Sequence, residues 1–274
     1  NVNEIAQVIC EAKSFTDKPI VGVLMGSHDM AEGIEMLKQQ GVPHYAFPED
    51  AMRAMATKCR FVEWRGMTIL GYRKFDADRE AVTRIIEAER EAGRNHLIEV
   101  KALEVLEAYG FPVVPWKLAE DADTAAQAAE AMGMPVAMKI VGPQILHKTD
   151  VGGVKLNLTS AEQVRDSYNA MLEQVRSHVG DETEIWGVLI QKMIGGGKET
   201  ILGLTRDPKF GPMLMFGLGG IYTEALRDVS FRLAPINERS AKVMVQSIRA
   251  AKLLEGVRGE APADTDAIAE NLQR

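Results

Sequence analysis

The sequence contains few of the features that mark secreted, membrane-spanning or zinc-binding proteins. Only Cys10 and Cys59 occur in 274 residues, too few for a disulfide framework and without the spacing of a zinc site. No uncharged apolar run approaches the about 18 residues of a membrane span, and no basic-then-apolar secretion signal opens the chain. We therefore expect a cytoplasmic protein with no membrane partner, in which both cysteines are core thiols.

Basic charge is also scarce. Lys and Arg total 32 against 39 Asp and Glu, which gives a net charge of −7 at pH 7, and the basic residues are scattered. Because binding to a phosphate backbone needs clustered Lys and Arg, nucleic acid is not an expected partner. A hydrophobic content of 46% is ordinary for a globular protein, and 274 residues suit two domains that each have a core.

The first 75 residues alternate between apolar strands and helices. Strands are expected at Pro19–Met25 and Val42–Phe47, with a helix over Met30–Gln39 and another that opens at Pro48. This alternation predicts a parallel α/β sheet. Two strands cannot form a stable doubly wound sheet, so either the chain starts midway through a domain or the missing half belongs to another polypeptide. The open sheet edge invites pairing, which makes an oligomer one expectation.

Residues 76–97 are interpreted as a linker with a charged helix over Asp78–Glu91. From Ile98 to Tyr109 apolar residues recur at helical spacing, and Gly110 supplies the stop. Further elements are expected downstream in a mixed α/β order. They are a strand over Val113–Lys117, a helix over Thr124–Met132, strands over Pro135–Val141 and Val154–Leu158, a helix opened by the capping box Ser160–Gln163, and helices over Glu238–Leu253 and Thr265–Leu272.

The stretch from Gln144 to Leu158 combines a histidine, a lysine and two adjacent glycines between two expected strands. Gly152 and Gly153 allow backbone conformations closed to other residues and let N–H groups face an anion. Lys148 adds positive charge, and His147 offers a nucleophilic imidazole. The residues are consistent with a phosphate-binding loop and also with an ordinary hairpin closed by a Gly-Gly turn.

Lys139 interrupts the apolar run Pro135–Val141. In a strand buried on both faces a lysine needs a partner, because an unpaired ammonium would shift its pKa or destabilise the fold. Lys139 therefore faces either solvent at a sheet edge or a bound anion. The nearby glycine-rich loop favours the anion.

Two further stretches carry carboxylates that suit a nucleotide site. The strands Ile185–Met193 and Lys198–Leu204 are predicted to pair antiparallel as one wall of an adenine slot. Glu199 can accept both ribose hydroxyls there, although an exposed strand-end glutamate is equally consistent. Glu224 and Asp228 lie four residues apart and follow an adjacent pair of glycines. Both carboxylates suit a hard cation such as Mg²⁺ if the segment is a single strand, since they would then lie on the same side.

Taken in order, these motifs resemble the ADP-forming acyl-CoA synthetases (acetate–CoA ligase, NDP-forming), which are related to succinyl-CoA synthetases and use an ATP-grasp domain. The resemblance covers nearly all of residues 98–273 and rests on six motifs. They are Gly133-Met-Pro-Val-Ala-Met-Lys139, His147-Lys-Thr-Asp-Val-Gly-Gly-Val154, Gln191-Lys-Met193 with Glu199, Asp207-Pro-Lys-Phe-Gly-Pro212, Phe216-Gly-Leu-Gly-Gly220 with Glu224 and Asp228, and Gly256-Val-Arg-Gly259.

The resemblance implies an α/β (α+β) fold with three parts. Residues 1–75, with Lys18–Gly26 and Gly41-Val-Pro43, look like the C-terminal part of a flavodoxin-like CoA-ligase domain. Residues 76–97 would be the linker helix. Residues 98–274 would be an ATP-grasp nucleotide-binding domain that lacks its C-terminal end.

The resemblance also implies a reversible reaction in which acyl-CoA, ADP and phosphate give an acid, CoA and ATP through a phosphohistidine. It gives each predicted site residue a role. Lys139 would hold nucleotide phosphates, Lys192 and Met193 would form the hinge whose backbone reads adenine, Glu199 would bind ribose, His147 on a mobile loop would relay phosphoryl, and Glu224 or Asp228 would bind Mg²⁺.

The family has further parts that this sequence does not contain. There is no Rossmann domain for CoA and no second loop with the primary phosphohistidine, so CoA and acyl-CoA are expected to bind through domains outside this chain, which is expected to be a fragment. One alternative is the synthetase-like regulatory region of a protein lysine acetyltransferase, without ligase activity. His147 favours the ligase, because a sensor needs no phosphoryl relay. A carboxylate–amine ligase is more distant, since it has no use for a histidine in that loop.

Overall fold

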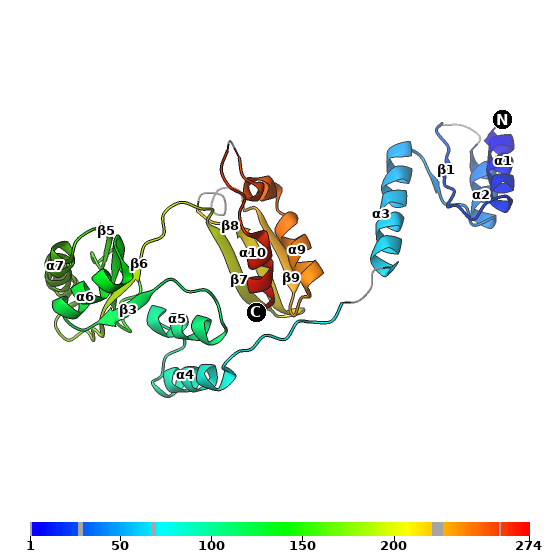
Figure 1. The fold of residues 1–274 in the computed structure, drawn as a ribbon. Coiled ribbons are helices and arrows are strands. Elements are labelled where there is room, and N and C mark those ends of the chain that lie inside the picture. Colours follow the sequence, from blue (N-terminus) through cyan, green and yellow to red (C-terminus); the bar gives the residue numbers. More distant parts are fainter. Residues whose placement is uncertain (1, 27–29, 67–69, 221–226, 258) are drawn as a thin grey trace. The chain divides into compact units, whose positions relative to one another are not determined.

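The chain divides into two compact units, residues 1–69 and residues 70–274 (Figure 1). The structure is a computed structural model and describes residues 2–26, 30–66, 70–220, 227–257 and 259–274. The sequence placed the first boundary at residue 75. Residues 70–75 belong instead to the second unit, where Arg73 pairs with Glu270 at 2.9 Å and Asn237 donates to the carbonyl oxygen of Leu70 at 3.4 Å. Across the described ranges, no helix has the length and apolar character needed to cross a membrane.

The first unit is a small α/β arrangement around a two-stranded parallel sheet. Its core is formed by Ala6, Leu24, Leu37 and Val42. The parallel pairing agrees with the sequence, but each strand is shorter than expected. The elements are α1 (Val2–Ser14), β1 (Gly22–Val23), α2 (Ala31–Gln39), β2 (His44–Tyr45) and α3 (Pro48–Gly66).

The prediction that both cysteines are core thiols is wrong for Cys59. Cys10 on α1 is half-buried, with its Sγ 3.9 Å from the carbonyl oxygen of Met36, but Cys59 is exposed on α3. Helix α3 also exposes Phe61 and Trp64, so its burial does not follow the apolar positions of its sequence.

The second unit begins with a four-stranded antiparallel sheet in the order β3-β6-β4-β5. Two of its helices start where the sequence predicts, after Asp78 and Ser160, and a third starts at Ala122, earlier than the predicted Thr124. Asp78, Asp121 and Ser160 each accept a backbone N–H from the third residue beyond. The strands are β3 (Trp116–Ala119), β4 (Val136–Val141), β5 (Val154–Leu158) and β6 (Gly187–Lys192). The helices are α4 (Arg79–Glu91), α5 (Glu99–Ala108), α6 (Ala122–Met132) and α7 (Ala161–Val179).

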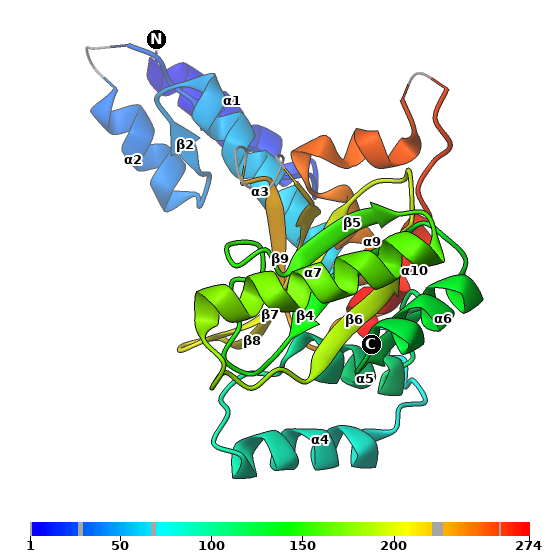
Figure 2. The same cartoon turned by 90° about the vertical axis from the view of Figure 1, so that its left-hand side faces the viewer.

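Both faces of this sheet are covered, which decides where each side chain of β4 points. Val136, Met138 and Ile140 belong to the core made with α6 and α7, and α7 crosses in front of β4 and β6 in Figure 2. The alternate position Val141 belongs instead to the cluster that contains Ile98 beside α5. Because side chains alternate along a strand, Lys139 lies on the α5 side of the sheet.

A second sheet, in the order β7-β8-β9, packs one face against the C-terminal helices. Phe216 and Leu218 of β8 are buried there with Met244 of α9 and Leu272 of α10. The helix predicted over Glu238–Leu253 is divided in two. The elements are β7 (Thr200–Asp207), β8 (Gly211–Leu218), β9 (Val229–Leu233), α9 (Glu238–Gln246), the 3₁₀ helix η1 (Arg249–Glu255) and α10 (Thr265–Gln273).

The predicted antiparallel pairing of Ile185–Met193 with Lys198–Leu204 is wrong. Strand β6 lies between β3 and β4, whereas β7 pairs with β8 in the other sheet. Four successive residues of β6, Gly187–Ile190, are buried. A strand buried on both faces takes a central position, so β6 has neighbours on both sides in its own sheet.

Candidate functional site

Lys139 is paired with a carboxylate that the sequence analysis did not single out. Its Nζ lies 2.6 Å from Glu99 Oε1 and 3.1 Å from Gln191 Oε1. The alternative of solvent at a sheet edge is wrong, whereas binding of an anion by Lys139 stays a prediction. Strand β4 is internal, and the partner comes from the first residue of α5.

Glu99 also binds the lysine of the glycine-rich loop. Its second oxygen, Oε2, accepts from Lys148 Nζ, so one carboxylate joins a strand lysine to a loop lysine. The side chains remain partly accessible, with 27% of Lys139, 27% of Glu99 and 19% of Lys148 exposed. Two ammonium groups and one carboxylate leave a charge of +1, which favours a further anion.

The pKa of Glu99 reflects both its burial and its two partners. Burial raises the pKa of the carboxyl, but the hydrogen bonds and charges of Lys139 and Lys148 outweigh this effect and hold it below the ordinary value. A carboxyl with a lowered folded-state pKa adds stability above its unfolded pKa, and this contribution is lost as the pH falls through the folded pKa. Glu99 is therefore ionised at neutral pH and acts as the counterion of both lysines.

The two glycines allow the loop to approach its neighbours closely. A Cβ on Gly153 would lie 2.3 Å from Ile140 Cγ2, and one on Gly152, whose φ is +72°, would lie 2.2 Å from Gln174 Nε2. Both N–H groups make hydrogen bonds within the loop. That of Gly153 donates to the carbonyl oxygen of Lys148 at 2.7 Å, and that of Gly152 donates to Thr149 at 3.1 Å. The glycines thus shape the loop, while Lys148 supplies its charge.

His147 precedes Lys148 in the same loop, and its side chain is exposed. Its backbone carbonyl accepts the N–H of Asp150 at 3.2 Å and so closes a turn of the loop. The loop therefore presents a nucleophilic ring to its surroundings, next in sequence to a lysine of the Glu99 cluster.

Lys192 and Met193 have other contacts at the end of β6. Lys192 Nζ donates to the carbonyl oxygens of Gly133 and Met134, at 2.6 and 3.0 Å. The backbone N–H of Met193 donates to Pro135 at 3.1 Å. The Lys192 side chain thus holds the turn before β4, and the Met193 N–H is not available to adenine in this arrangement. Recognition of adenine at this hinge stays a prediction.

Glu199 lies beside the glycine pair that follows β8. The Gly219 N–H donates to the Glu199 carbonyl oxygen at 2.7 Å, and a Cβ on Gly220 would lie 3.5 Å from Glu199 Oε2. Glu199 and both glycines border a cavity of about 340 Å³. A carboxylate at the rim of a cavity is compatible with ribose binding, which stays a prediction.

Asp228 has a structural role that the sequence analysis did not include. Its Oδ1 accepts the N–H of Arg249 at 2.8 Å and its Oδ2 accepts that of Ala250 at 2.7 Å, so both oxygens bind backbone amides where η1 begins. Glu224, the other predicted metal ligand, lies outside the described residues. Within the described ranges, no cluster of three or more His, Cys, Asp or Glu side chains could hold a metal ion.

We predict that Asp228→Asn lowers the free energy of unfolding by about 1–2 kcal/mol, because the amide loses one of two hydrogen bonds to backbone N–H groups. The Mg²⁺ concentration required for nucleotide binding should not change. Thermal unfolding and calorimetry at several Mg²⁺ concentrations measure the two effects. Asp264→Asn is the matched control, because the amide oxygen can still accept the Ala267 N–H that Asp264 accepts at the start of α10, so its stability should stay close to that of the parent. An Asp228 variant of normal stability with a raised Mg²⁺ requirement would restore the metal prediction.

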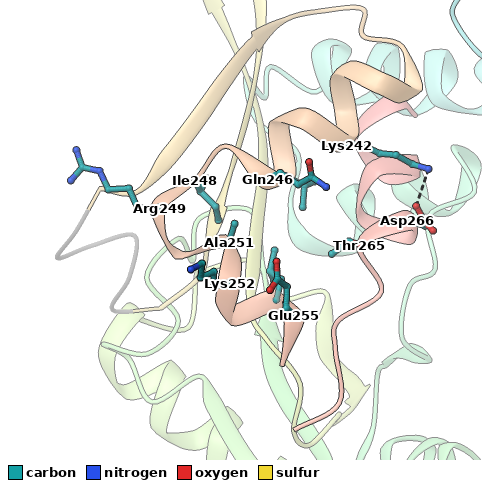
Figure 3. A pocket seen from close by; sticks show the side chains of 11 residues that line it. Lys242, Gln246, Ile248, Arg249, Ala251, Lys252, Glu255, Thr265 and Asp266 are labelled. Atoms are coloured by element: carbon teal, nitrogen blue, oxygen red, sulfur yellow. Dashed lines mark ion pairs between the residues drawn. The ribbon is translucent and has the colours of Figure 1, made fainter. Parts of the chain in front are cut away.

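A separate cavity of about 460 Å³ lies between α9, η1 and α10 (Figure 3). It contains none of the residues predicted from the sequence. Lys242, which lines it, already pairs with Glu238 at 2.9 Å and with Asp266 at 3.1 Å. Arg249 points away from the other labelled side chains in Figure 3. We therefore assign the functional site to the Glu99 cluster and the adjoining loop.

Strand, loop and helix N-terminus together define a positively charged cluster on a mixed α/β fold. The chain belongs to the ATP-grasp domain family, which it matches over residues 88–274. This confirms the family and the fold class expected from the sequence motifs.

Among its relatives is the 4-hydroxybutyrate–CoA ligase (ADP-forming) of Nitrosopumilus maritimus, 39% identical over 274 residues, which are 100% of this chain and 39% of the relative. The acetate–CoA ligase (ADP-forming) I subunit beta of Pyrococcus furiosus is 44% identical over 193 residues, 70% of this chain and 83% of the relative. This chain thus spans about two fifths of the Nitrosopumilus ligase and most of the Pyrococcus beta subunit.

A solved structure has the same fold over the larger part of the chain. It is the dinucleotide forming acetyl-coenzyme A synthetase 1 of Ca. Korarchaeum cryptofilum, in complex with coenzyme A and Mg-AMPPCP, with its phosphohistidine segment pointing towards the nucleotide binding site. The TM-score is 0.61 at 41% sequence identity, and the match covers 70% of this chain and 82% of the other.

Proposed function

We propose that this chain is the nucleotide-binding region of an ADP-forming acyl-CoA ligase. The complete enzyme interconverts acyl-CoA, ADP and phosphate with an acid, CoA and ATP. One observation carries the proposal: Lys139 of β4 and Lys148 of the loop converge on one anionic group beside the exposed His147. The ligase names of relatives and the Mg-AMPPCP bound to a solved relative support it.

The chemistry of the site is phosphoryl transfer. In the direction of ATP synthesis, a β-phosphate oxygen of ADP bonds to the phosphorus on His147. The nitrogen–phosphorus bond breaks, and its electron pair returns to the imidazole. Lys139 and Lys148 bind phosphate oxygens and balance the charge that develops on them. Glycines in the loop allow His147 to move between sites.

Mg²⁺ would neutralise charge between the nucleotide phosphates when bound. The residues described here fit the phosphates better than the metal, because both oxygens of Asp228 are engaged by backbone amides. We therefore propose Glu224, rather than Asp228, as the metal ligand from this chain.

The remaining substrates require partners. We propose that CoA and the acyl group bind to other domains or subunits, as suggested by the relative that is named a beta subunit. We also propose that residues 1–69 are the final part of a ligase domain and that the enzyme is cytoplasmic.

Calorimetric titration with Mg-ADP tests the proposal. We expect binding with a dissociation constant below about 1 mM, which corresponds to roughly 4 kcal/mol. Adenosine should bind more weakly, because it offers no phosphate to the two lysines. If Mg-ADP does not bind at millimolar concentration, or if adenosine binds equally well, the assignment of the lysine cluster to nucleotide phosphate is wrong.

A further inference from the structure

The Glu99 carboxylate binds two lysines at once, as an anionic ligand would. It places one oxygen on Lys139 and the other on Lys148, and the two lysines come from different elements. A phosphate group is also negatively charged, and its oxygens also accept hydrogen bonds from ammonium groups. The carboxylate and a nucleotide phosphate would therefore use the same N–H groups.

We propose that Glu99 is an internal competitor for the phosphate site, which holds Lys139 and Lys148 in the ligand-free chain and is displaced from them by the phosphates of the nucleotide. This inference rests on the proposed function and adds a regulatory residue to it. Glu99 lies in the first turn of α5, and its contacts to the lysines link that helix to β4 and to the loop.

A phosphate can reach the lysines and displace Glu99. Roughly a quarter of the Glu99 and Lys139 side chains is exposed, so an anion can approach and the released carboxylate can reach water. A carboxylate at a helix N-terminus is also favoured by the backbone N–H groups there. Glu99 therefore keeps a stabilising environment after it loses its lysines.

Displacement also has a consequence for the loop. Lys148 follows His147 directly, and its contact to Glu99 connects the loop to α5. When phosphate takes Lys148 from Glu99, this tether is released while the ammonium group stays at the nucleotide. Glu99 thus couples the position of the histidine loop to the occupation of the phosphate site.

The Glu99→Gln variant tests whether Glu99 competes with phosphate for the two lysines or only holds the lysines in position. The amide is nearly the same size but carries no charge, so the cluster changes from +1 to +2 and the lysines lose their strongest internal partner. We expect pyrophosphate and Mg-ADP to bind the full chain about three- to tenfold more tightly than the parent, the range expected for partly exposed ion pairs. Unchanged or weaker pyrophosphate binding by the folded variant overturns the inference.

Three further variants sharpen the test. Glu104→Gln is the matched control on the same helix, because Glu104 pairs with Lys101 and not with the phosphate lysines; its affinities should equal those of the parent. The gain in Glu99→Gln should shrink when Lys148→Met is added. If Glu99→Gln does not fold, Glu99→Asp replaces it, since the shorter carboxylate cannot reach both lysines and should also bind pyrophosphate more tightly.

The two probes distinguish the two proposals. Pyrophosphate requires only the lysines, whereas Mg-ADP also requires the adenine and ribose contacts. Tighter pyrophosphate binding without any Mg-ADP binding contradicts the proposed function and supports the competition by Glu99. Normal Mg-ADP binding by the parent, with no gain in the Glu99→Gln variant, supports the proposed function and contradicts the competition by Glu99.

Discussion

His147→Ala should abolish phosphoryl exchange between ATP and the complete enzyme while leaving nucleotide binding close to normal. A neutral imidazole can attack a phosphoryl group without a separate base and later release it. We expect the rate of acyl-CoA formation to fall by at least about 10³-fold, the size of effect seen when an enzyme loses its nucleophile. Acid-labile label from ATP, followed to the peptide that contains His147, measures the intermediate.

The matched control is His178→Ala. His178 is also exposed, but its Nδ1 lies 2.8 Å from the carbonyl oxygen of Gln174 near the end of α7, and it has no place in the loop. This variant should retain the labelled intermediate and the parent rate. If His147→Ala forms acyl-CoA at the parent rate, or if label never appears on His147 in the active enzyme, the relay is not at this residue.

Lys139→Met should weaken both catalysis and the fold. The loss of one charged donor to developing phosphate charge costs roughly 2–4 kcal/mol of transition-state stabilisation, and less of ground-state binding. Glu99 would keep only Lys148, so we also expect a loss of about 1–3 kcal/mol in the free energy of unfolding. Chemical denaturation and steady-state kinetics measure the two losses separately, and the fall in kcat should exceed the rise in KM.

Lys155→Met on the adjacent strand β5 is the control for this variant, because Lys155 lies opposite Met138 and outside the Glu99 cluster. It should change neither kinetics nor stability by more than about 0.5 kcal/mol. A Lys139→Met enzyme with normal kcat and KM would mean that Lys139 serves only as the structural partner of Glu99.

Local patterns in the sequence predicted most elements of this fold, because their signals are local. Asp78, Asp121 and Ser160 start helices through side-chain hydrogen bonds that span only three residues. The parallel pair of the first unit and the antiparallel pair β4–β5 also follow from strand order and loop length. Pairing over longer distances was less predictable, and β6 was assigned to the wrong neighbour.

In the site, too, local features were predicted from the sequence and long-range contacts were not. His147, Lys139 and Lys148 were identified from the sequence, because an apolar run with one lysine and a glycine-rich loop are features of contiguous residues. Glu99 was missed, since its neighbours Ile98 and Val100 made it read as an ordinary polar position of an amphipathic helix. Asp228 was predicted to be a metal ligand, because the surrounding sequence does not show that its carboxylate accepts the backbone N–H groups of Arg249 and Ala250.

The sequence by itself therefore determined the family, the order of most elements and three candidate residues of the site, His147, Lys139 and Lys148. Only the tertiary structure decided that Lys139 and Lys148 share one counterion, 40 or more residues away in the chain. The physical reason is that a partly buried charge is stabilised by a partner that is near in space rather than in sequence. The packing of α5 against the sheet, and not any local pattern, brings Glu99 to both lysines.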